Sequence, residues 1–325
     1  MSARLRRACA VLLLTVSACA LAHAEADNAR PGPRAIWIWE EASYAMLDGE
    51  AQARAGIAFL RDKGIATAYL YADAYAGRNL IAACPQRYRA LVRRMHAAGL
   101  RVVALLGSGY LHTERYLLPE HRRDARAMLQ RVLDYNTAAA PDERFDGIGL
   151  DIEPHMLDGW ASRKMALLGD FLDMSEALMR QKNAVAPSLP MGPAIQFWYD
   201  GIPIEWKGRR QAMNEHVQDL YDYVALMDYR DHAAGGDGLV SHARDELEYG
   251  NRIGKPVLVG VETAPNAIRK VSFHHLREAD MERELGETAR ALGRMPAFGG
   301  FVIHHYAAYR RWLGLDQGSV HDQNR

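Results

Sequence analysis

The amino-acid sequence predicts a single (β/α)8 barrel. Short runs rich in β-branched and aromatic residues alternate with amphipathic stretches of helical spacing, which is the pattern of repeated βα units around a parallel sheet. We count eight such runs, and a chain of 325 residues is long enough for a barrel. The hydrophobic content of 49% and the charged content of 25% are typical of a globular chain with a large core.

The eight predicted strands are bounded by turn residues or by polar helical stretches. They are Ala35–Trp39, Ile65–Tyr71, Arg101–Leu106, Gly147–Glu153, Leu189–Gln196, Tyr223–Tyr229, Pro256–Glu262 and Gly300–His304. Every gap between them holds a plausible helix. Apolar residues at spacings of three and four mark the clearest of these helices, which are Ala51–Arg61, Gln86–Ala98, Arg122–Leu133 and Met165–Met179.

A doubly wound open sheet uses the same alternation of strands and helices. Two observations favour the barrel over it. No glycine-rich phosphate loop follows the first predicted strand. Eight βα units are also more than an open sheet of this length ordinarily contains.

The first residues resemble an export signal. Arg4, Arg6 and Arg7 precede the apolar run Ala8–Ala22, which is too short to span a bilayer. Ala22-His23-Ala24 has the pattern of a signal peptidase site, whereas Val16-Ser17-Ala18-Cys19 resembles a loose lipoprotein box that would lipidate Cys19. We expect a signal peptide at residues 1–24, the barrel at residues 32–314 and a polar tail at residues 315–325. The expected location is the periplasm or the exterior, with a lipoprotein as the alternative.

Charge and cysteine content exclude several classes of partner. Lysine plus arginine and aspartate plus glutamate total 40 each, so no net positive charge indicates a nucleic acid or an anionic membrane. We expect no membrane insertion after signal cleavage. Removal of Cys9 leaves Cys84 alone or with a lipidated Cys19, so no structural disulfide is expected.

The segment Phe145–Pro154 carries the strongest functional pattern. Side chains alternate along a strand, so Ile148, Leu150 and Ile152 share the face under the helices. The other face, which turns to the barrel interior, carries Asp151 and Glu153 at the mouth where barrels place their active sites. Two carboxyl groups so close share their protons as a coupled pair, and one of them can serve as a general acid. The alternative is an acidic strand end that caps a helix or binds a cation.

The motif Asp146-Gly147-x-Gly149-x-Asp151-x-Glu153 resembles the D-G-x-D-x-D-x-E signature of family 18 chitinases and related barrel hydrolases. Gly149 stands where that family has an inward aspartate. The resemblance implies that Glu153 protonates the leaving sugar oxygen and that Asp151 orients a reacting N-acetyl group. It implies an amino-sugar-containing poly- or oligosaccharide as substrate, with no cofactor.

Other strand ends add to the resemblance and to the predicted site. Met227-Asp228-Tyr229-Arg230 resembles the family's M-x-Y-D, in which the tyrosine helps hold the N-acetyl group, and His304 falls near the place of a substrate-floor tryptophan. Aromatic side chains at the rim can stack on sugar rings. The predicted catalytic residues are Glu153, Asp151 and Tyr229, and the predicted substrate-binding residues are Trp37, Tyr71, Gln196, Trp198, Asp228, Arg230, Glu262 and His304.

Three alternatives remain open from the sequence. Retaining glycosidases of another barrel group use acids on strands four and seven, so Glu262 could be a nucleophile if it lies about 5 Å from Glu153. A carbohydrate-binding barrel without catalysis is the second alternative. A metal-dependent hydrolase is the third. We expect no metal, because the residues of the pairs His274-His275 and His304-His305 should point to opposite faces if they lie in strands.

The export signal gives the first testable prediction. Mass spectrometry of the native protein should find a mature N-terminus at Glu25, or at a lipidated Cys19, because a signal peptidase removes the preceding segment. An intact Met1 on the native protein would contradict export.

Overall fold

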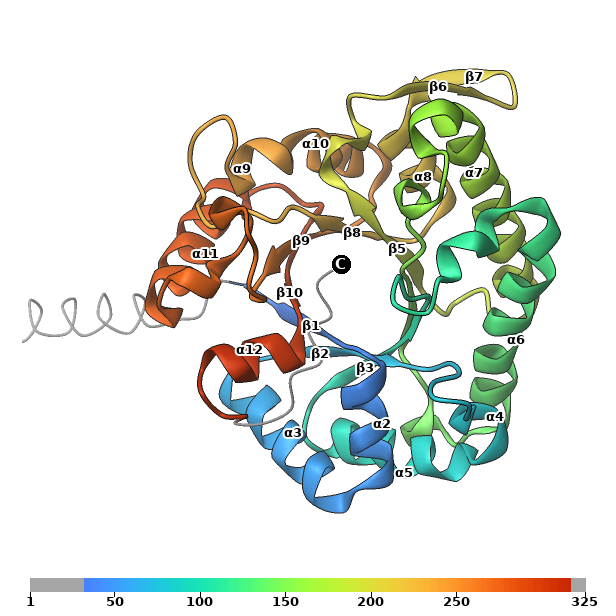
Figure 1. Ribbon diagram of the computed structural model, residues 1–325, viewed down its shortest axis with the longest axis vertical. Helices are drawn as coiled ribbons and strands as arrows, with labels where there is room; N and C mark the ends of the chain where they lie inside the picture. Colours follow the sequence, from blue (N-terminus) through green and yellow to red (C-terminus); the bar gives the residue numbers. More distant parts are fainter. Residues whose placement is uncertain (1–31, 317–325) are drawn as a thin grey trace, which may run out of the picture. The chain divides into compact units, whose positions relative to one another are not determined.

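The computed structural model describes residues 32–316, which form a closed barrel of parallel strands inside a ring of helices (Figure 1). Following the chain around the barrel, each strand pairs with the next, and the last strand pairs with the first. The strands are β1 (Arg34–Ile38), β2 (Thr67–Tyr71), β3 (Arg101–Leu106), β4 (Gly147–Leu150), β5 (Met191–Gln196), β8 (Val224–Met227), β9 (Val257–Glu262) and β10 (Phe298–His304). The predicted (β/α)8 barrel is therefore confirmed.

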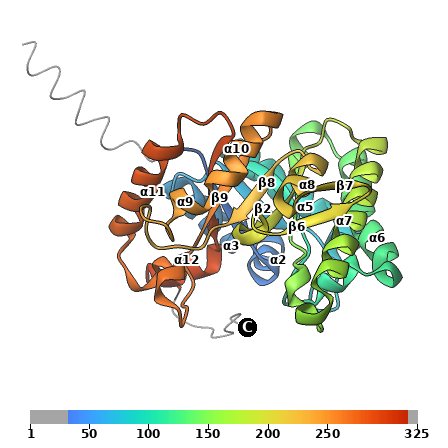
Figure 2. The same cartoon turned by 90° about the horizontal axis from the view of Figure 1, so that it is seen from above.

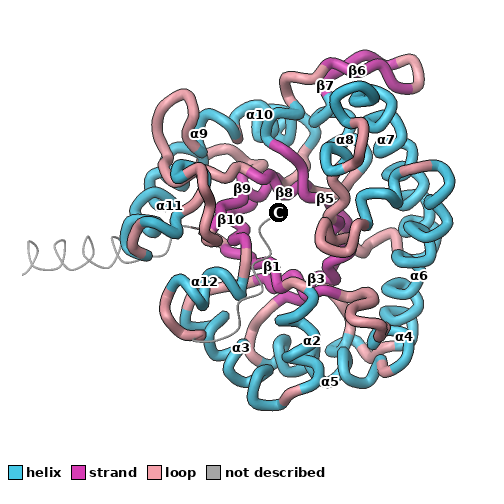
Figure 3. The backbone as a smooth tube through the Cα atoms, in the orientation of Figure 1, coloured by secondary structure: helices cyan, strands magenta, loops and turns pink. Residues whose placement is uncertain are grey.

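Helices connect the strands on the outside, and Figure 3 shows the strands enclosed by them. The four helices predicted from apolar spacing are present as α3 (Glu50–Asp62), α5 (Pro85–Ala97), α6 (Arg122–Ala138) and α7 (Trp160–Val185). The longer helices are α2 (Glu40–Asp48), α3 (Glu50–Asp62), α5 (Pro85–Ala97), α6 (Arg122–Ala138), α7 (Trp160–Val185), α8 (Met213–Leu220), α10 (Arg244–Ile253), α11 (Glu278–Leu292) and α12 (Tyr306–Trp312). The short helices α4 (Leu80–Ala83) and α9 (Leu239–His242) precede α5 and α10.

A hairpin outside the barrel was not expected from the sequence. Strands β6 (Pro203–Trp206) and β7 (Arg209–Ala212) pair antiparallel and lie beside α7 and α8 at the periphery (Figures 1 and 2). The turn between them contains Lys207 and Gly208, both with positive φ, as a two-residue hairpin turn requires.

The barrel has an inner and an outer apolar layer. The inner cluster fills the barrel with side chains from alternate strand positions, among them Trp37, Tyr69, Val103 and Met227. The outer cluster lies between strands and helices and contains Ile148, Leu150 and Ile152, as the alternation predicts. The inner layer closes the barrel below its mouth, so a ligand can enter only at the ends.

The fourth strand ends earlier than predicted, at Leu150. Leu150 pairs with Leu106 on one side and with Pro193 on the other, and proline has no N–H to continue a ladder. The β3 chain turns away at Gly107, which has a φ of +88°. A Cβ atom at Gly107 would lie 2.1 Å from the carbonyl oxygen of Asp151, so only glycine allows this close approach. Asp151 and Glu153 therefore lie in a loop just above the barrel.

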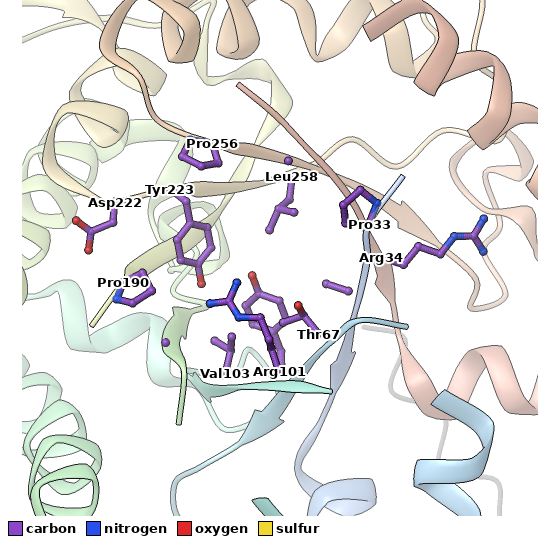
Figure 4. A pocket seen from close by; sticks show the side chains of 14 residues that line it. Pro33, Arg34, Thr67, Arg101, Val103, Pro190, Asp222, Tyr223, Pro256 and Leu258 are labelled. Atoms are coloured by element: carbon purple, nitrogen blue, oxygen red, sulfur yellow. The ribbon is translucent and has the colours of Figure 1, made fainter. Parts of the chain in front are cut away.

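A cavity lies at the end of the barrel where the strands begin, opposite the end that carries Asp151 and Glu153. It has a volume of about 380 Å³, and Figure 4 shows Tyr223 and Arg101 reaching into it between Pro190, Pro256 and Leu258. Barrel enzymes carry out their chemistry at the carboxyl ends of the strands, so this cavity is not the candidate active site.

The predicted signal peptide at residues 1–24 lies outside the described residues, as does most of the predicted tail. Within residues 32–316, no helix combines the length and the apolar character needed to cross a membrane.

Candidate active site

A cavity of about 610 Å³ opens at the carboxyl ends of the strands. Segments that follow β1, β3, β4 and β10 form its wall, and the two acids of the fourth-strand motif both border it. Its lining residues are Trp39, Glu40, Ser108, Gly109, Tyr110, His112, Asp151, Glu153, Met156, His304 and His305. Carboxyl, imidazole and indole groups thus share one wall, and neither arginine nor lysine belongs to it.

Asp151 is the more deeply buried acid of the motif, with 8% of its surface exposed. Burial raises the pKa of its carboxyl well above the usual value, and the negative charges of Glu153 and Glu40 raise it further. Asp151 therefore takes up a proton more readily than an ordinary aspartate.

Glu153 lies nearer the solvent, with 20% of its side chain exposed. The amide nitrogen of Gln196, at the end of β5, donates a hydrogen bond of 2.7 Å to Glu153 Oε2. His155 Nε2 lies 3.5 Å from the same oxygen. These contacts fix the orientation of the carboxyl while its position lets a ligand in the cavity reach it.

Glu262 is held by three donors at the end of β9. The backbone N–H groups of Thr263 and Ala264 both donate to Oε1 at 2.7 Å, and His304 Nδ1 lies 2.7 Å from Oε2. Trp39 Nε1 donates to His304 Nε2 at 3.0 Å, so Nδ1 of His304 carries the hydrogen that bonds to Glu262. The chain Trp39–His304–Glu262 therefore fixes the orientation of the imidazole and of the Glu262 carboxyl.

Tyr229 is buried with its ring against His304, where the charges of both groups of acids act on it. Burial raises the pKa of its phenol well above 10, and the charges of Glu262, Asp151 and Glu153 add to the effect. Its ring centroid is 5.6 Å from that of His304. The structure thus brings together six of the predicted site residues, which are Asp151, Glu153, Gln196, Tyr229, Glu262 and His304.

Asp228 and Arg230 belong to a separate group of hydrogen-bonded side chains that does not line the cavity. Asp228 is fully buried, and its carboxylate lies 2.9 Å from His242 Nδ1. Arg230 donates to Asp237, and its guanidinium lies 5.0 Å from the centre of the Phe197 ring. Neither side chain borders the cavity.

Two of the three predicted aromatic residues are buried, and the third is partly exposed. Trp37 is buried in the inner cluster below His304, with ring centroids 5.8 Å apart. Tyr71 is also buried, and its hydroxyl donates to the carbonyl oxygen of Ala74. Trp198 lies farther out, beside His155 and Trp160 at centroid distances of 5.8 and 6.0 Å. Of the three, Trp198 is partly exposed.

Glu40 is the one acid lining the cavity that the sequence analysis did not predict. It is the first residue of α2, directly after Trp39, and only 1% of its surface is exposed. Asp151 was predicted because it lies at the carboxyl end of a barrel strand, and Glu40 lies just after the end of β1 in the same way. Its place at the start of a helix with a second acid, Glu41, made it resemble a solvent-exposed helix end.

His304 and His305 both border the cavity, although we expected adjacent histidines to face opposite sides. The expectation fails because His305 lies beyond the last residue of β10. Burial lowers the pKa of His305 well below its usual value. Within residues 32–316, no group of three or more His, Cys, Asp or Glu side chains has the geometry of a metal site.

Position 149 differs physically from the family motif. A Cβ atom on Gly149 would lie 2.6 Å from Cδ1 of Tyr69, whose ring fills the space above the glycine. The barrel interior therefore has no room for an inward aspartate at this position unless Tyr69 moves.

No family model matches the chain, and no curated protein matches it either. Solved structures do. A candidate α-L-fucosidase from Bacteroides thetaiotaomicron VPI-5482 is 12% identical with a TM-score of 0.54, over 89% of this chain and 95% of that one. The second catalytic domain of Ostrinia furnacalis Group II chitinase is 10% identical with a TM-score of 0.50, over 89% and 98%.

A calcium-binding mutant of Bacteroides uniformis β-glucuronidase 2 is 12% identical with a TM-score of 0.52, over 79% of this chain and 28% of that one. The barrel is similar to known glycosidases. The similarity agrees with the resemblance of the fourth-strand motif to chitinases. At identities of 10% to 12% it establishes the fold, and the chemistry has to be argued from the site.

Replacement of Gly149 tests the packing under the acids. Gly149→Ala should lower the free energy of unfolding by about 1–3 kcal/mol, because the new methyl group overlaps the Tyr69 ring. Urea unfolding of Gly149→Ala, Tyr69→Leu and the double variant measures it. The cost of the alanine should shrink in the Tyr69→Leu background, and an unchanged cost would mean that the ring is not the obstacle.

Proposed function

We propose that the protein is an exported glycoside hydrolase that cleaves a glycosidic bond in an amino-sugar-containing poly- or oligosaccharide. The observation that carries the proposal is the placement of Asp151 and Glu153 on one wall of a cavity at the carboxyl ends of the strands. The similarity in fold to glycosidases supports it. Export to the periplasm or the exterior rests on the predicted signal at residues 1–24.

Glu153 is the general acid in this proposal. Its carboxyl reaches the cavity, and Gln196 holds one oxygen, so the other can face the glycosidic oxygen. When the bond between the sugar carbon and the leaving oxygen breaks, the proton of Glu153 passes to that oxygen. The Glu153 carboxylate that remains then takes a proton from the water that completes hydrolysis.

Asp151 assists by orienting the N-acetyl group of the sugar. The acetamido oxygen is the nucleophile and forms a bond to the anomeric carbon, so a positive charge develops on the acetamido group. The developing positive charge favours the ionised form of Asp151, and in this buried place the two charges are poorly screened, so they attract each other strongly. Tyr229, whose ring lies against that of His304, is the phenol that helps hold the same group in this proposal.

Glu262 acts in binding and positioning in this proposal. Three donors already occupy its oxygens, and His304 stands between it and the cavity. A nucleophile needs a free oxygen directed at the anomeric carbon. A retaining mechanism with Glu262 as the nucleophile and Glu153 as the acid therefore requires the Glu262 carboxyl group to give up one of these hydrogen bonds.

Substitution of the acids tests the proposal. Glu153→Gln removes the transferable proton and keeps the shape, so turnover should fall by roughly a hundredfold or more while sugar binding persists. Asp151→Asn should be similarly severe. Glu262→Gln should cost less, mainly in KM. Hydrolysis and binding are measured on a panel of amino-sugar oligosaccharides.

Glu120→Gln is the matched control, because Glu120 is an exposed acid that does not line the cavity. Loss of turnover in Glu262→Gln with rescue by azide as a glycosyl azide would make Glu262 the nucleophile. If the wild type cleaves no glycan but one binds wild type and Glu153→Gln equally well, the protein is a carbohydrate-binding barrel.

Metal chelation separates this proposal from a metal-dependent hydrolase. Treatment with EDTA should leave turnover unchanged, because the proposed reaction uses carboxyl groups and the substrate's own amide. Loss of turnover that zinc or manganese restores would favour the metal-dependent alternative.

A further inference from the structure

Lys164 is a partly exposed cation that two tryptophan rings hold in place. Its ammonium nitrogen lies 5.6 Å from the ring centre of Trp160 and 5.6 Å from that of Trp198. The two rings are themselves 6.0 Å apart, so both attract the same ammonium group. No carboxylate within residues 32–316 forms an ion pair with Lys164. The positive charge is therefore ordered by aromatic rings and has no counterion in the described part of the chain.

The indole N–H groups beside this ammonium are also without an acceptor. Those of Trp160 and Trp198 make no hydrogen bond among the residues that the structure describes. By contrast, Trp39, Trp206 and Trp312 each donate to an acceptor of the protein. The first turn of α7, which begins at Trp160, carries no acidic side chain. An ammonium and two N–H donors thus lie together, and a negatively charged oxygen group would satisfy them.

This group of three residues, Trp160, Lys164 and Trp198, lies next to the catalytic acid. His155 Nε2 is 3.5 Å from Glu153 Oε2, and the His155 ring packs edge-on against the rings of Trp198 and Trp160 at 5.8 and 6.3 Å. The chain also reaches Trp198 two residues after Gln196, which donates to Glu153. An oligosaccharide that is bound at Glu153 and extends past His155 therefore meets the Lys164 ammonium.

The charges around the cavity decide where a ligand can carry a negative group. Glu40, Asp151 and Glu153 line the cavity, and no arginine or lysine lines it with them. A ligand anion in the cavity itself would be repelled by these acids. His155 separates them from Lys164, so a negative group is favoured there. The anionic unit of such a ligand lies beyond the bond at which Glu153 acts.

We propose that Trp160, Lys164 and Trp198 form a subsite for a sugar unit that carries a carboxylate, so that the preferred substrate is an acidic amino-sugar glycan. The inference rests on the proposed function for the position of the cleaved bond, and it adds the charge of a neighbouring unit. One ammonium balances one negative charge, as a carboxylate supplies, while the indole N–H groups donate to its oxygens. Since the rings already hold the ammonium, little freedom is lost on binding.

Calorimetric binding to oligosaccharides that differ only in charge tests the subsite. The probes are a neutral N-acetylglucosamine pentasaccharide and two derivatives, one with a carboxylate on the unit at the reducing end and one with it on the unit at the other end. Binding is measured in Glu153→Gln, so that hydrolysis does not consume the ligand. One derivative should bind roughly five- to tenfold more tightly than the neutral compound, and added salt should weaken this preference.

Substitution of Lys164 identifies the source of the preference. In the same background, Lys164→Met keeps the unbranched side chain and removes the charge, so the ratio of the two affinities should fall to about one. Lys164→Arg keeps a charge and should keep most of the ratio. Lys207→Met is the matched control, because Lys207 also lies over a tryptophan, Trp206, but belongs to the peripheral hairpin. It removes the same charge and should leave the ratio in place.

NMR of the indole N–H groups places the bound carboxylate. The preferred derivative should shift the signals of Trp160 and Trp198 more than the neutral compound does, and the signal of Trp312, which donates to Leu276, should not distinguish the two. Equal or weaker binding of both derivatives would overturn the subsite, even if the wild type hydrolyses the neutral compound. A preference that persists in Lys164→Met would overturn it as well. If the preference depends on Lys164 but the wild type cleaves none of the compounds, the subsite stands and the proposed hydrolysis falls.

Discussion

Closure of the barrel is the constraint from which the site follows. In a closed sheet each strand turns alternate side chains inward, and the inner layer of apolar residues fills the space below the mouth. Asp151 and Glu153 continue the inward face of β4, so they are placed above this layer, where the cavity opens. The close approach of Gly107 to Asp151 then fixes how far the acids stand from the barrel.

The electrostatics of the mouth follow from what surrounds each acid. Glu262 receives three hydrogen bonds, which satisfy its oxygens in a buried place. Glu153 has an amide donor and contact with solvent. Asp151 is buried and close to other negative charges, and burial raises the pKa of Glu40 although Ser108 provides a hydrogen bond that opposes the effect. Differences of this kind between neighbouring carboxyls allow one site to hold an acid and an anion at the same pH.

The features that depend on short stretches of sequence, such as the strands and the faces of their side chains, could be predicted. All eight barrel strands and the inward direction of Asp151 and Glu153 follow from alternation and spacing. The directions of Asp228 and Arg230 depend on His242 and Asp237, which the segment after β8 folds back onto them, so strand position alone could not predict them. Burial of Glu40 likewise depends on the loops that cover it. The peripheral hairpin could have been predicted in part, because Gly208 suits the positive φ of its two-residue turn.

The central claim is that Asp151 stabilises a substrate whose own acetamido group attacks. Calorimetric titration with a thiazoline derivative of an N-acetyl amino sugar tests it most directly, because the fused ring mimics the cyclic intermediate of that attack. The account predicts that wild-type protein binds the thiazoline at least about a hundredfold more tightly than the parent sugar, and that Asp151→Asn loses this advantage. Equal affinity for the two compounds, or an advantage that survives in Asp151→Asn, would contradict the account.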